Sequence, residues 1–255
     1  MEFWYEERGG GTPLVLLHGF PLDGRIWEGQ LAGLSDRFRV IVPDLPGFGR
    51  SKAGKPFTLA SIADDVHALL GRIGALPCVL GGLSMGGYVA LPYVRTFAAD
   101  LRGLILVDTR AEADSDEAKA NRQKMAQLAI EQGATPVAGQ MLPRMLDPHN
   151  AQIRPDLVIR LRQIMEGCPP ATIANACLAM RDREDQVEFL SSIRVPTLLI
   201  FGERDAITPP AMGQAMHERI ANSRLVVVPH AGHLSPMEQP NAVNEAISQF
   251  LYGLA

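Results

Sequence analysis

Several features that mark particular classes of protein are missing from this chain of 255 residues. Its only cysteines are Cys78, Cys168 and Cys177, with no CxxC pair and no spacing typical of zinc or iron–sulfur sites. No apolar run approaches the roughly 20 residues that cross a bilayer. The start, MEFWYEERGGG, lacks the basic leader and apolar segment of a signal peptide. We therefore expect a cytoplasmic protein with packed thiols, no membrane span and no bound metal.

Clustered positive charge is also missing. The chain has 24 Lys and Arg against 28 Asp and Glu, a formal net charge of −4, and its cations are scattered. Nucleic acids and anionic membranes are bound by clustered cations, so we expect neither as a partner. With 47% hydrophobic residues, the length suits one large α/β unit that can carry an inserted lid.

Alternating apolar runs and helical segments predict the fold. Short apolar runs typical of buried parallel strands lie at 14–17, 40–42, 79–80, 104–107, 198–201 and 225–228. Segments of helical period lie at 26–34, 59–73, 85–97, 211–220 and 242–251. The pattern predicts an α/β fold whose mostly parallel sheet has helices on both faces. The opening FWYEER, before three glycines, resembles an edge strand that enters a hairpin.

The alternation stops between about residues 110 and 193, where we predict four helices and no strand. Asp114 or Ser115 can cap the first, Pro136 opens the second, and Pro155 and Pro169-Pro170 begin the last two. We expect a helical lid over residues 110–193, inserted into a core domain formed by residues 1–109 and 194–255.

A candidate nucleophile lies at the end of one predicted strand. Gly82-Leu83-Ser84-Met85-Gly86 follows the apolar CVLG and begins a helical segment, the setting of a G-x-S-x-G nucleophile elbow. In that strained turn, Gly82 and Gly86 leave room that a Cβ would occupy. The alternative is a glycine-rich turn in which Ser84 only caps the helix.

A serine nucleophile needs a base that is held by a third group. Asp205 follows the strand-like TLLIFGER, and His233 follows LVVV, so both can reach the edge of the sheet where Ser84 lies. Asp108, at the end of LILVD, could hold the imidazole instead, and His230 could be the base. We predict Ser84, Asp205 and His233 as the triad.

Oxyanion stabilisation requires backbone N–H groups that point at the developing charge. Met85 follows the nucleophile and offers one. Phe20 offers the second from the loop His18-Gly19-Phe20-Pro21, where Gly19 permits a sharp turn and Pro21 has no N–H to give. An ordinary Gly-Pro turn is the alternative.

These motifs together resemble the α/β-hydrolase superfamily, and in particular its lid-bearing branch of serine carboxylesterases and 3-oxoadipate enol-lactonases. The residues that carry the resemblance are HGF at 18–20, DLPGFGRS at 44–51, GLSMGG at 82–87 and FGERDAITP at 201–209. It implies the α/β-hydrolase fold and the same catalytic and oxyanion residues, with Asp44 in a structural role. It also implies that no metal or organic cofactor is needed.

The resemblance implies hydrolysis of a small-molecule ester or lactone through an acyl-enzyme intermediate. Haloalkane dehalogenases and epoxide hydrolases of this fold use an aspartate nucleophile, so the serine at position 84 argues against those reactions. Cofactor-free perhydrolases, or haloperoxidases, and carbon–carbon bond hydrolases use the same three residue types and stay open as alternatives. A catalytically silent ligand receptor is a further alternative.

Substrate choice is expected to depend on the lid. Its methionines, including Met125, Met141 and Met145, could line an adaptable acyl pocket or could simply fill gaps between helices. Arg110 and Arg144 could bind a substrate carboxylate, or could be surface or hinge residues.

Overall fold

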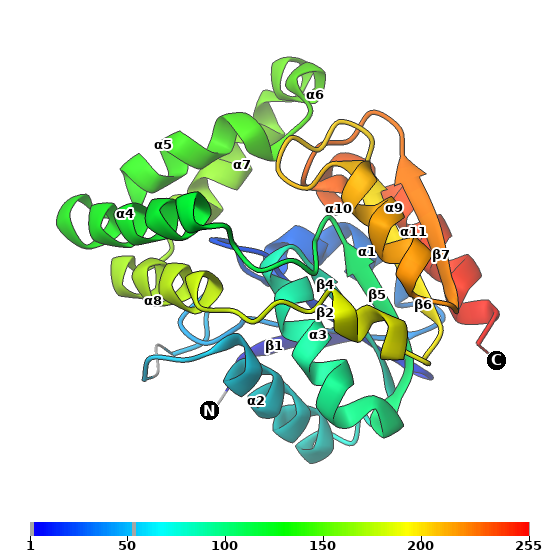
Figure 1. The fold of residues 1–255 in the computed structure, drawn as a ribbon. Coiled ribbons are helices and arrows are strands. Elements are labelled where there is room, and N and C mark those ends of the chain that lie inside the picture. Colours follow the sequence, from blue (N-terminus) through cyan, green and yellow to red (C-terminus); the bar gives the residue numbers. More distant parts are fainter. Residues whose placement is uncertain (1–2, 53–54, 255) are drawn as a thin grey trace.

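The computed structural model describes residues 3–52 and 55–254 and is built around one sheet (Figure 1). In these described residues the sheet has seven strands in the order β1-β3-β2-β4-β5-β6-β7. Six of them pair in parallel, which confirms the predicted sheet. The strands are β1 Tyr5–Arg8, β2 Pro13–Leu17, β3 Arg39–Pro43, β4 Cys78–Leu83, β5 Leu101–Val107, β6 Thr197–Gly202 and β7 Ser223–Val228.

The first strand lies at the edge of the sheet as predicted, but the predicted hairpin is wrong. β1 pairs antiparallel with β3, with Tyr5 opposite Pro43, and not with the next strand along the chain. The reason is that β2 has β3 on one side and β4 on the other, so no edge of β2 is left for β1.

Alternate residues of the strands feed two hydrophobic clusters, one on each face of the sheet. The helices that cover these faces are α1 Glu28–Leu34, α2 Leu59–Arg72, α3 Met85–Phe97, α9 Pro210–Arg219, α10 Ser235–Glu238 and α11 Pro240–Tyr252, with short 3₁₀ turns at Gly24–Trp27, Ala98–Asp100 and Glu188–Ser192. Val15 and Leu80 pack in one cluster with residues of α2, α3 and α9, whereas Leu14 and Val79 pack in the other with residues of α1 and α11.

Between β5 and β6 the described chain forms five helices, one more than the four predicted. They are α4 Asp116–Gln132, α5 Ala134–Met145, α6 Pro148–Ile153, α7 Pro155–Glu166 and α8 Pro170–Arg181. The extra helix, α6, is short and follows Asp147, whose side chain accepts the N–H of His149 and caps it. Ser115 caps α4 as predicted, whereas α5 begins two residues before Pro136.

These five helices form a layer of their own beside the sheet (Figure 1). α4 packs against α8 and α5, and α5 packs against α7. The division into a core and a lid at residues 110 and 193 stays a prediction. In the part of the chain that the structure describes, every helix is too short or too polar to cross a membrane.

The interior strand β5 offers a test of the core. Ile105 is fully buried on it, while Arg102 on the same strand is exposed. We expect Ile105→Ala to lower the free energy of unfolding by about 3 kcal/mol, because it removes buried methyl groups and leaves a cavity. Arg102→Ala should change it by no more than about 0.5 kcal/mol. Urea unfolding of both variants measures this, and equal effects would contradict the assignment of the core.

Candidate active site

The turn between β4 and α3 holds Ser84 in a strained backbone conformation. Its φ is 52° and its ψ is −112°, unusual for a residue with a Cβ. A Cβ on Gly82 would come within 2.3 Å of the Gly86 backbone, and one on Gly86 within 2.4 Å of the Leu17 carbonyl oxygen. The two glycines therefore permit the turn, as the sequence predicts.

The side chain of Ser84 does not cap the helix that it precedes. Its carbonyl oxygen accepts the N–H groups of Gly87 and Tyr88, while its hydroxyl makes no capping hydrogen bond. The residue is partly exposed. The hydroxyl is thus left for other chemistry, which argues against the capping alternative.

A buried acid–base pair lies on the loops after β6 and β7. Asp205 Oδ2 lies 2.8 Å from Nδ1 of His233, and both side chains are almost fully buried. The second oxygen, Oδ1, accepts the N–H groups of Ile207 and Thr208. Because Nδ1 faces the carboxylate, Nε2 is the nitrogen left to accept a proton.

Thr208 is a member of this site that the sequence analysis missed. Its hydroxyl lies 2.6 Å from Asp205 Oδ2 and 3.2 Å from His233 Nδ1. Burial alone would raise the pKa of Asp205, but His233 and Thr208 together lower it below its usual range. The carboxylate is therefore kept ionised. The spacing Asp-x-x-Thr is the sequence feature that could have revealed this contact, because an aspartate side chain often accepts the backbone N–H of a residue two or three positions later.

Asp108, the alternative acid, binds other groups. Its Oδ1 accepts the N–H of Gly202 at 2.7 Å, and its Oδ2 accepts the hydroxyl of Ser235 at 2.6 Å. Burial and the neighbouring charge of Asp205 raise its pKa well above the ordinary value. The structure thus brings His233 to Asp205, and Asp108 holds the backbone around them.

His230, the alternative base, lies on the surface. It is exposed, has a φ of 55°, and its carbonyl oxygen accepts hydrogen bonds from Asn150 and Gln239. Nothing in these contacts directs its ring at Asp205.

The strand β5 brings the serine and histidine loops to the same edge of the sheet. Ser84 N–H donates to the carbonyl of Val107, and the Thr109 hydroxyl donates to the carbonyl of Ser84. Asp108, which lies between Val107 and Thr109 in the sequence, accepts the hydroxyl of Ser235, two residues after His233. In the described residues no hydrogen bond joins Ser84 to His233; such contacts often tighten only around a substrate.

The loop that carries Phe20 lies directly against the serine. A Cβ on Gly19 would come within 3.3 Å of the Ser84 Cβ and 2.7 Å of a methyl carbon of Leu83, so glycine lets the loop lie here without displacing either group. Burial lowers the pKa of His18, which keeps its ring neutral. The ring accepts the N–H of Leu45 at Nε2, so Nδ1 donates to the Gly19 carbonyl. Met85 is the first residue of α3, and the N–H groups of a helix's first turn have no acceptor within the helix. Its N–H is therefore free of the helix's own hydrogen bonds.

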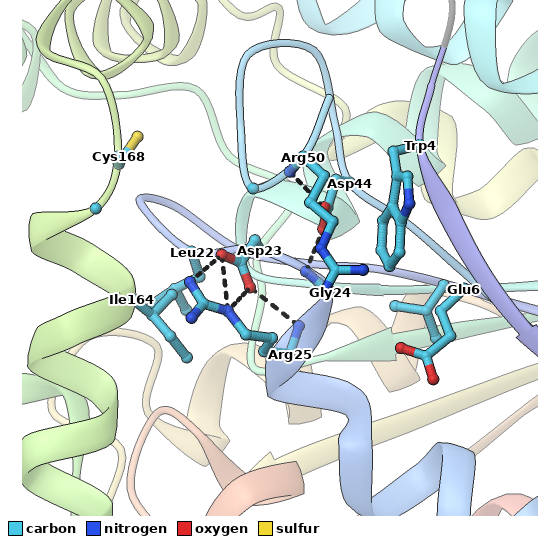
Figure 2. A pocket seen from close by; sticks show the side chains of 13 residues that line it. Trp4, Glu6, Leu22, Asp23, Gly24, Arg25, Asp44, Arg50, Ile164 and Cys168 are labelled. Carbon is cyan, nitrogen blue, oxygen red and sulfur yellow. Dashed lines mark hydrogen bonds and ion pairs between the residues drawn. The ribbon is translucent and has the colours of Figure 1, made fainter. Parts of the chain in front are cut away.

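A hollow of about 270 Å³ behind this loop is held together by Asp44 (Figure 2). The Asp44 carboxylate accepts the backbone N–H groups of Gly24 and Arg50, which ties two loops together. The Arg50 guanidinium lies 4.4 Å from the centre of the Trp4 ring, and Arg25 pairs with the neighbouring Asp23. These contacts fit the structural role expected for Asp44, since its carboxylate is taken up by backbone N–H groups and that of Asp23 by Arg25.

The predicted substrate-binding residues lie in two different places. Arg110, Met125 and Met141 line one cavity of about 690 Å³, and Arg144 joins them there. Met145 does not; it is 1% exposed and packs in the core beneath α5. Helical period does not separate the two, because residues four apart share a face of a helix. Met145 is the last residue of α5, one turn further along, and there the apolar cluster encloses its side chain.

Glu238 is a second buried residue that the sequence analysis missed. Its carboxylate accepts the backbone N–H groups of Gly232 and Asp147 and the side-chain amide of Asn150, each at 2.8 Å. Burial raises its pKa, although these donors oppose the shift. Glu238 thus joins the loop that carries His233 to the start of α6. A lone Glu in a short helix carries no sequence signal of this role.

Comparison with known proteins adds a family. The sequence model of the alpha/beta hydrolase fold matches residues 12–240. Over 87% of this chain, the sequence is 31% identical to "3-oxoadipate enol-lactonase 2" of Acinetobacter baylyi, of which 82% is covered. Over 94% of this chain, it is 29% identical to a "Pimeloyl-[acyl-carrier protein] methyl ester esterase" of Neisseria meningitidis serogroup B, of which 93% is covered.

Among solved structures, a thermophilic esterase from Thermogutta terrifontis, described as malate bound, superposes with a TM-score of 0.97. It is 43% identical, and the match covers 99% of this chain and 93% of that one.

The raised pKa of Asp108 predicts a pH dependence of stability. A carboxyl whose pKa is higher in the folded state stabilises the fold at low pH, and this contribution is lost as the pH rises through the folded pKa. We expect Asp108→Asn to gain stability relative to the unsubstituted protein as the pH rises above about 4, because the amide cannot ionise. Urea unfolding between pH 4 and 9 tests this, and two parallel curves would contradict it.

Proposed function

The chain belongs to the α/β-hydrolase fold family, and on that premise we propose that it is a serine hydrolase of small carboxylic esters or lactones. The observation that carries the proposal is the buried pair of Asp205 and His233. It lies at the same edge of the sheet as Ser84, whose backbone is strained and whose hydroxyl makes no capping hydrogen bond. The names of the relatives, an enol-lactonase and two esterases, support the same reaction class.

In the proposed mechanism Ser84 Oγ attacks the substrate carbonyl while His233 Nε2 takes the hydroxyl proton. The N–H groups of Phe20 and Met85 stabilise the oxyanion that forms. The tetrahedral intermediate collapses, the alcohol leaves with the proton from His233, and Ser84 carries the acyl group. Water then attacks this ester by the reverse path. Throughout, Asp205 holds the imidazole tautomer and stabilises the imidazolium.

Two buried carboxylates support this machinery without touching substrate. Asp108 holds Gly202 and Ser235, and Glu238 holds Gly232, so the loop around His233 is fixed on both sides of the ring. A base fixed in this way loses little entropy when it enters the transition state. We assign the helices within residues 110–193 to a lid that covers the proposed catalytic site.

The first test is hydrolysis of p-nitrophenyl esters from acetate to octanoate. We expect Ser84→Ala to lower kcat by about 10⁴-fold or more, because the covalent route is lost. Ser191→Ala is the matched control, since Ser191 is exposed and its hydroxyl donates to the carbonyl oxygen of Glu188 within a 3₁₀ turn. Hydrolysis that survives in Ser84→Ala would refute the assigned nucleophile, and an inactive unsubstituted protein would refute the esterase proposal.

A second test concerns Thr208, which donates to the proposed catalytic acid. We expect Thr208→Val to lower kcat about five-fold and to move the acid limb of the pH–rate profile, since one hydrogen bond to the Asp205–His233 pair is lost. Thr208→Ser keeps the hydroxyl and should restore both values. If the serine variant is as impaired as the valine variant, the hydroxyl is not what matters.

A further inference from the structure

A short segment at the end of α5 and the start of α6, residues 144–150, contacts both loops that carry the proposed acid and base (Figure 1). Within this α5–α6 segment, Arg144 donates to the carbonyl oxygen of Ala206 at 2.9 Å. Asp147 forms an ion pair with Arg204 at 3.0 Å. The residues immediately before and after the proposed acid are therefore both held by this segment.

The same segment reaches the loop before His233 through Glu238. One oxygen of the Glu238 carboxylate accepts the side-chain amide of Asn150, and the other accepts the N–H of Gly232, each at 2.8 Å. The Asn150 amide nitrogen also donates to the carbonyl oxygen of His230 at 2.8 Å. Because Asn150 and Glu238 are both buried, water does not compete easily for these hydrogen bonds.

The α5–α6 segment and the histidine loop lie backbone against backbone at Gly232. A Cβ on Gly232 would come within 2.5 Å of the Asp147 nitrogen and 2.6 Å of the Leu146 carbonyl carbon. On the other side, a Cβ on Gly202, at the end of β6, would come within 2.0 Å of the Gly232 carbonyl oxygen. The loop is thus held between the sheet and the α5–α6 segment. A displacement of this segment would therefore displace the residue that precedes His233.

A polar connection of this kind fixes geometry more narrowly than apolar packing. A buried carboxylate is costly unless donors surround it, and Glu238 has three of them. A buried network whose polar groups are satisfied favours one arrangement of the segments that it joins. Catalysis depends on such precision, because a misplacement of about 1 Å can cost about 10²-fold in rate.

We propose that Asn150 is a positioning residue for the reaction: through Glu238, it holds His233 in the orientation that accepts the proton of the nucleophile. Asp147 acts in the same way on the loop of the proposed acid, through its ion pair with Arg204. The proposal rests on the function proposed above and assigns part of that machinery to the helices between β5 and β6. Asn150 and Asp147 are almost fully buried, so neither side chain is available to contact a substrate.

Asn150→Ala tests this role. The carboxylate of Glu238 keeps its two backbone donors in this variant, so we expect the protein to fold. For p-nitrophenyl acetate we expect kcat to fall about ten-fold and KM to change by less than about two-fold, because the base is misplaced while the binding surface stays intact. A raised KM with an unchanged kcat would overturn the proposal, since the segment would then shape the binding site instead.

Asn244→Ala is the matched control. Asn244 lies partly buried on α11, and its amide also donates to a backbone carbonyl oxygen, that of Gly29 at 3.0 Å. We expect a lower Tm in both alanine variants, since each loses a hydrogen bond, but a lower kcat only in Asn150→Ala. If the two variants lower kcat equally, the loss reflects stability alone and the positioning role is refuted.

The ring of His233 gives a second readout, which does not depend on turnover. In protein labelled with ¹⁵N in its histidine rings, the nitrogen shifts report which nitrogen carries the proton, and His233 is assigned by its absence in His233→Gln. We expect the neutral ring to carry its proton on Nδ1, which lies 2.8 Å from Asp205 Oδ2. Asn150→Ala should give a mixture of both tautomers, whereas Asn244→Ala should keep the Nδ1–H form.

Asp147→Asn tests the acid side and keeps the proposal testable if Asn150→Ala does not fold. Asparagine can still cap α6, whereas the ion pair with Arg204 is lost. Because Arg204 is 46% exposed, solvent screens this pair, and we expect kcat to fall only about two-fold to three-fold with KM unchanged. An unchanged kcat would refute the role of Asp147.

The outcomes keep the two proposals apart. If esters are hydrolysed but Asn150→Ala leaves kcat and the tautomer of His233 unchanged, the positioning role is refuted and the serine hydrolase stands. If kcat falls while the tautomer stays the same, the route through His233 is refuted. If the unsubstituted protein hydrolyses no ester, the proposed function fails, while the tautomer still decides whether Asn150 holds the ring.

Discussion

The sharp turn at Ser84 is the constraint on which the rest of the site depends. A residue with a Cβ holds a positive φ there, and a Cβ at either Gly82 or Gly86 would clash with backbone atoms of the turn or of β2. Gly82 and Gly86 let β4 run directly into α3, and Gly19 lets the preceding loop lie against the serine. The strain is small compared with the burial of β4, which is fully enclosed in the sheet.

Four buried carboxylates hold the loops around this turn. Each accepts backbone N–H groups, as a buried polar group requires, and each joins segments that are distant or sharply bent. Asp44 fixes the loops below Phe20, Asp108 and Glu238 fix the histidine loop, and Asp205 fixes its own turn and also the imidazole. The same chemical group therefore serves as scaffold at three positions and, in the proposed mechanism, as part of the catalytic machinery at the fourth.

The two acidic residues nearest His233, Asp205 and Asp108, have pKa values that are shifted in opposite directions. Asp205 has a lowered pKa because His233 and Thr208 outweigh its burial, whereas burial and the charge of Asp205 raise the pKa of Asp108. Two neighbouring carboxylates in a dry site do not both ionise easily, so the environment separates their roles. Asp108 can then bind the loop while Asp205 keeps the negative charge beside the imidazole.

The sequence by itself determined the parallel sheet, the elbow at Ser84 and the segments that carry Asp205 and His233. Each of these depends on local rules: apolar runs between turn residues, and glycines where the backbone must bend. The tertiary structure decided what depends on contacts between distant segments. It paired β1 with β3, chose Asp205 over Asp108 for His233, buried Met145 and connected Glu238 to Gly232. No local pattern encodes such pairings, because each depends on which groups the fold brings within hydrogen-bond or packing distance.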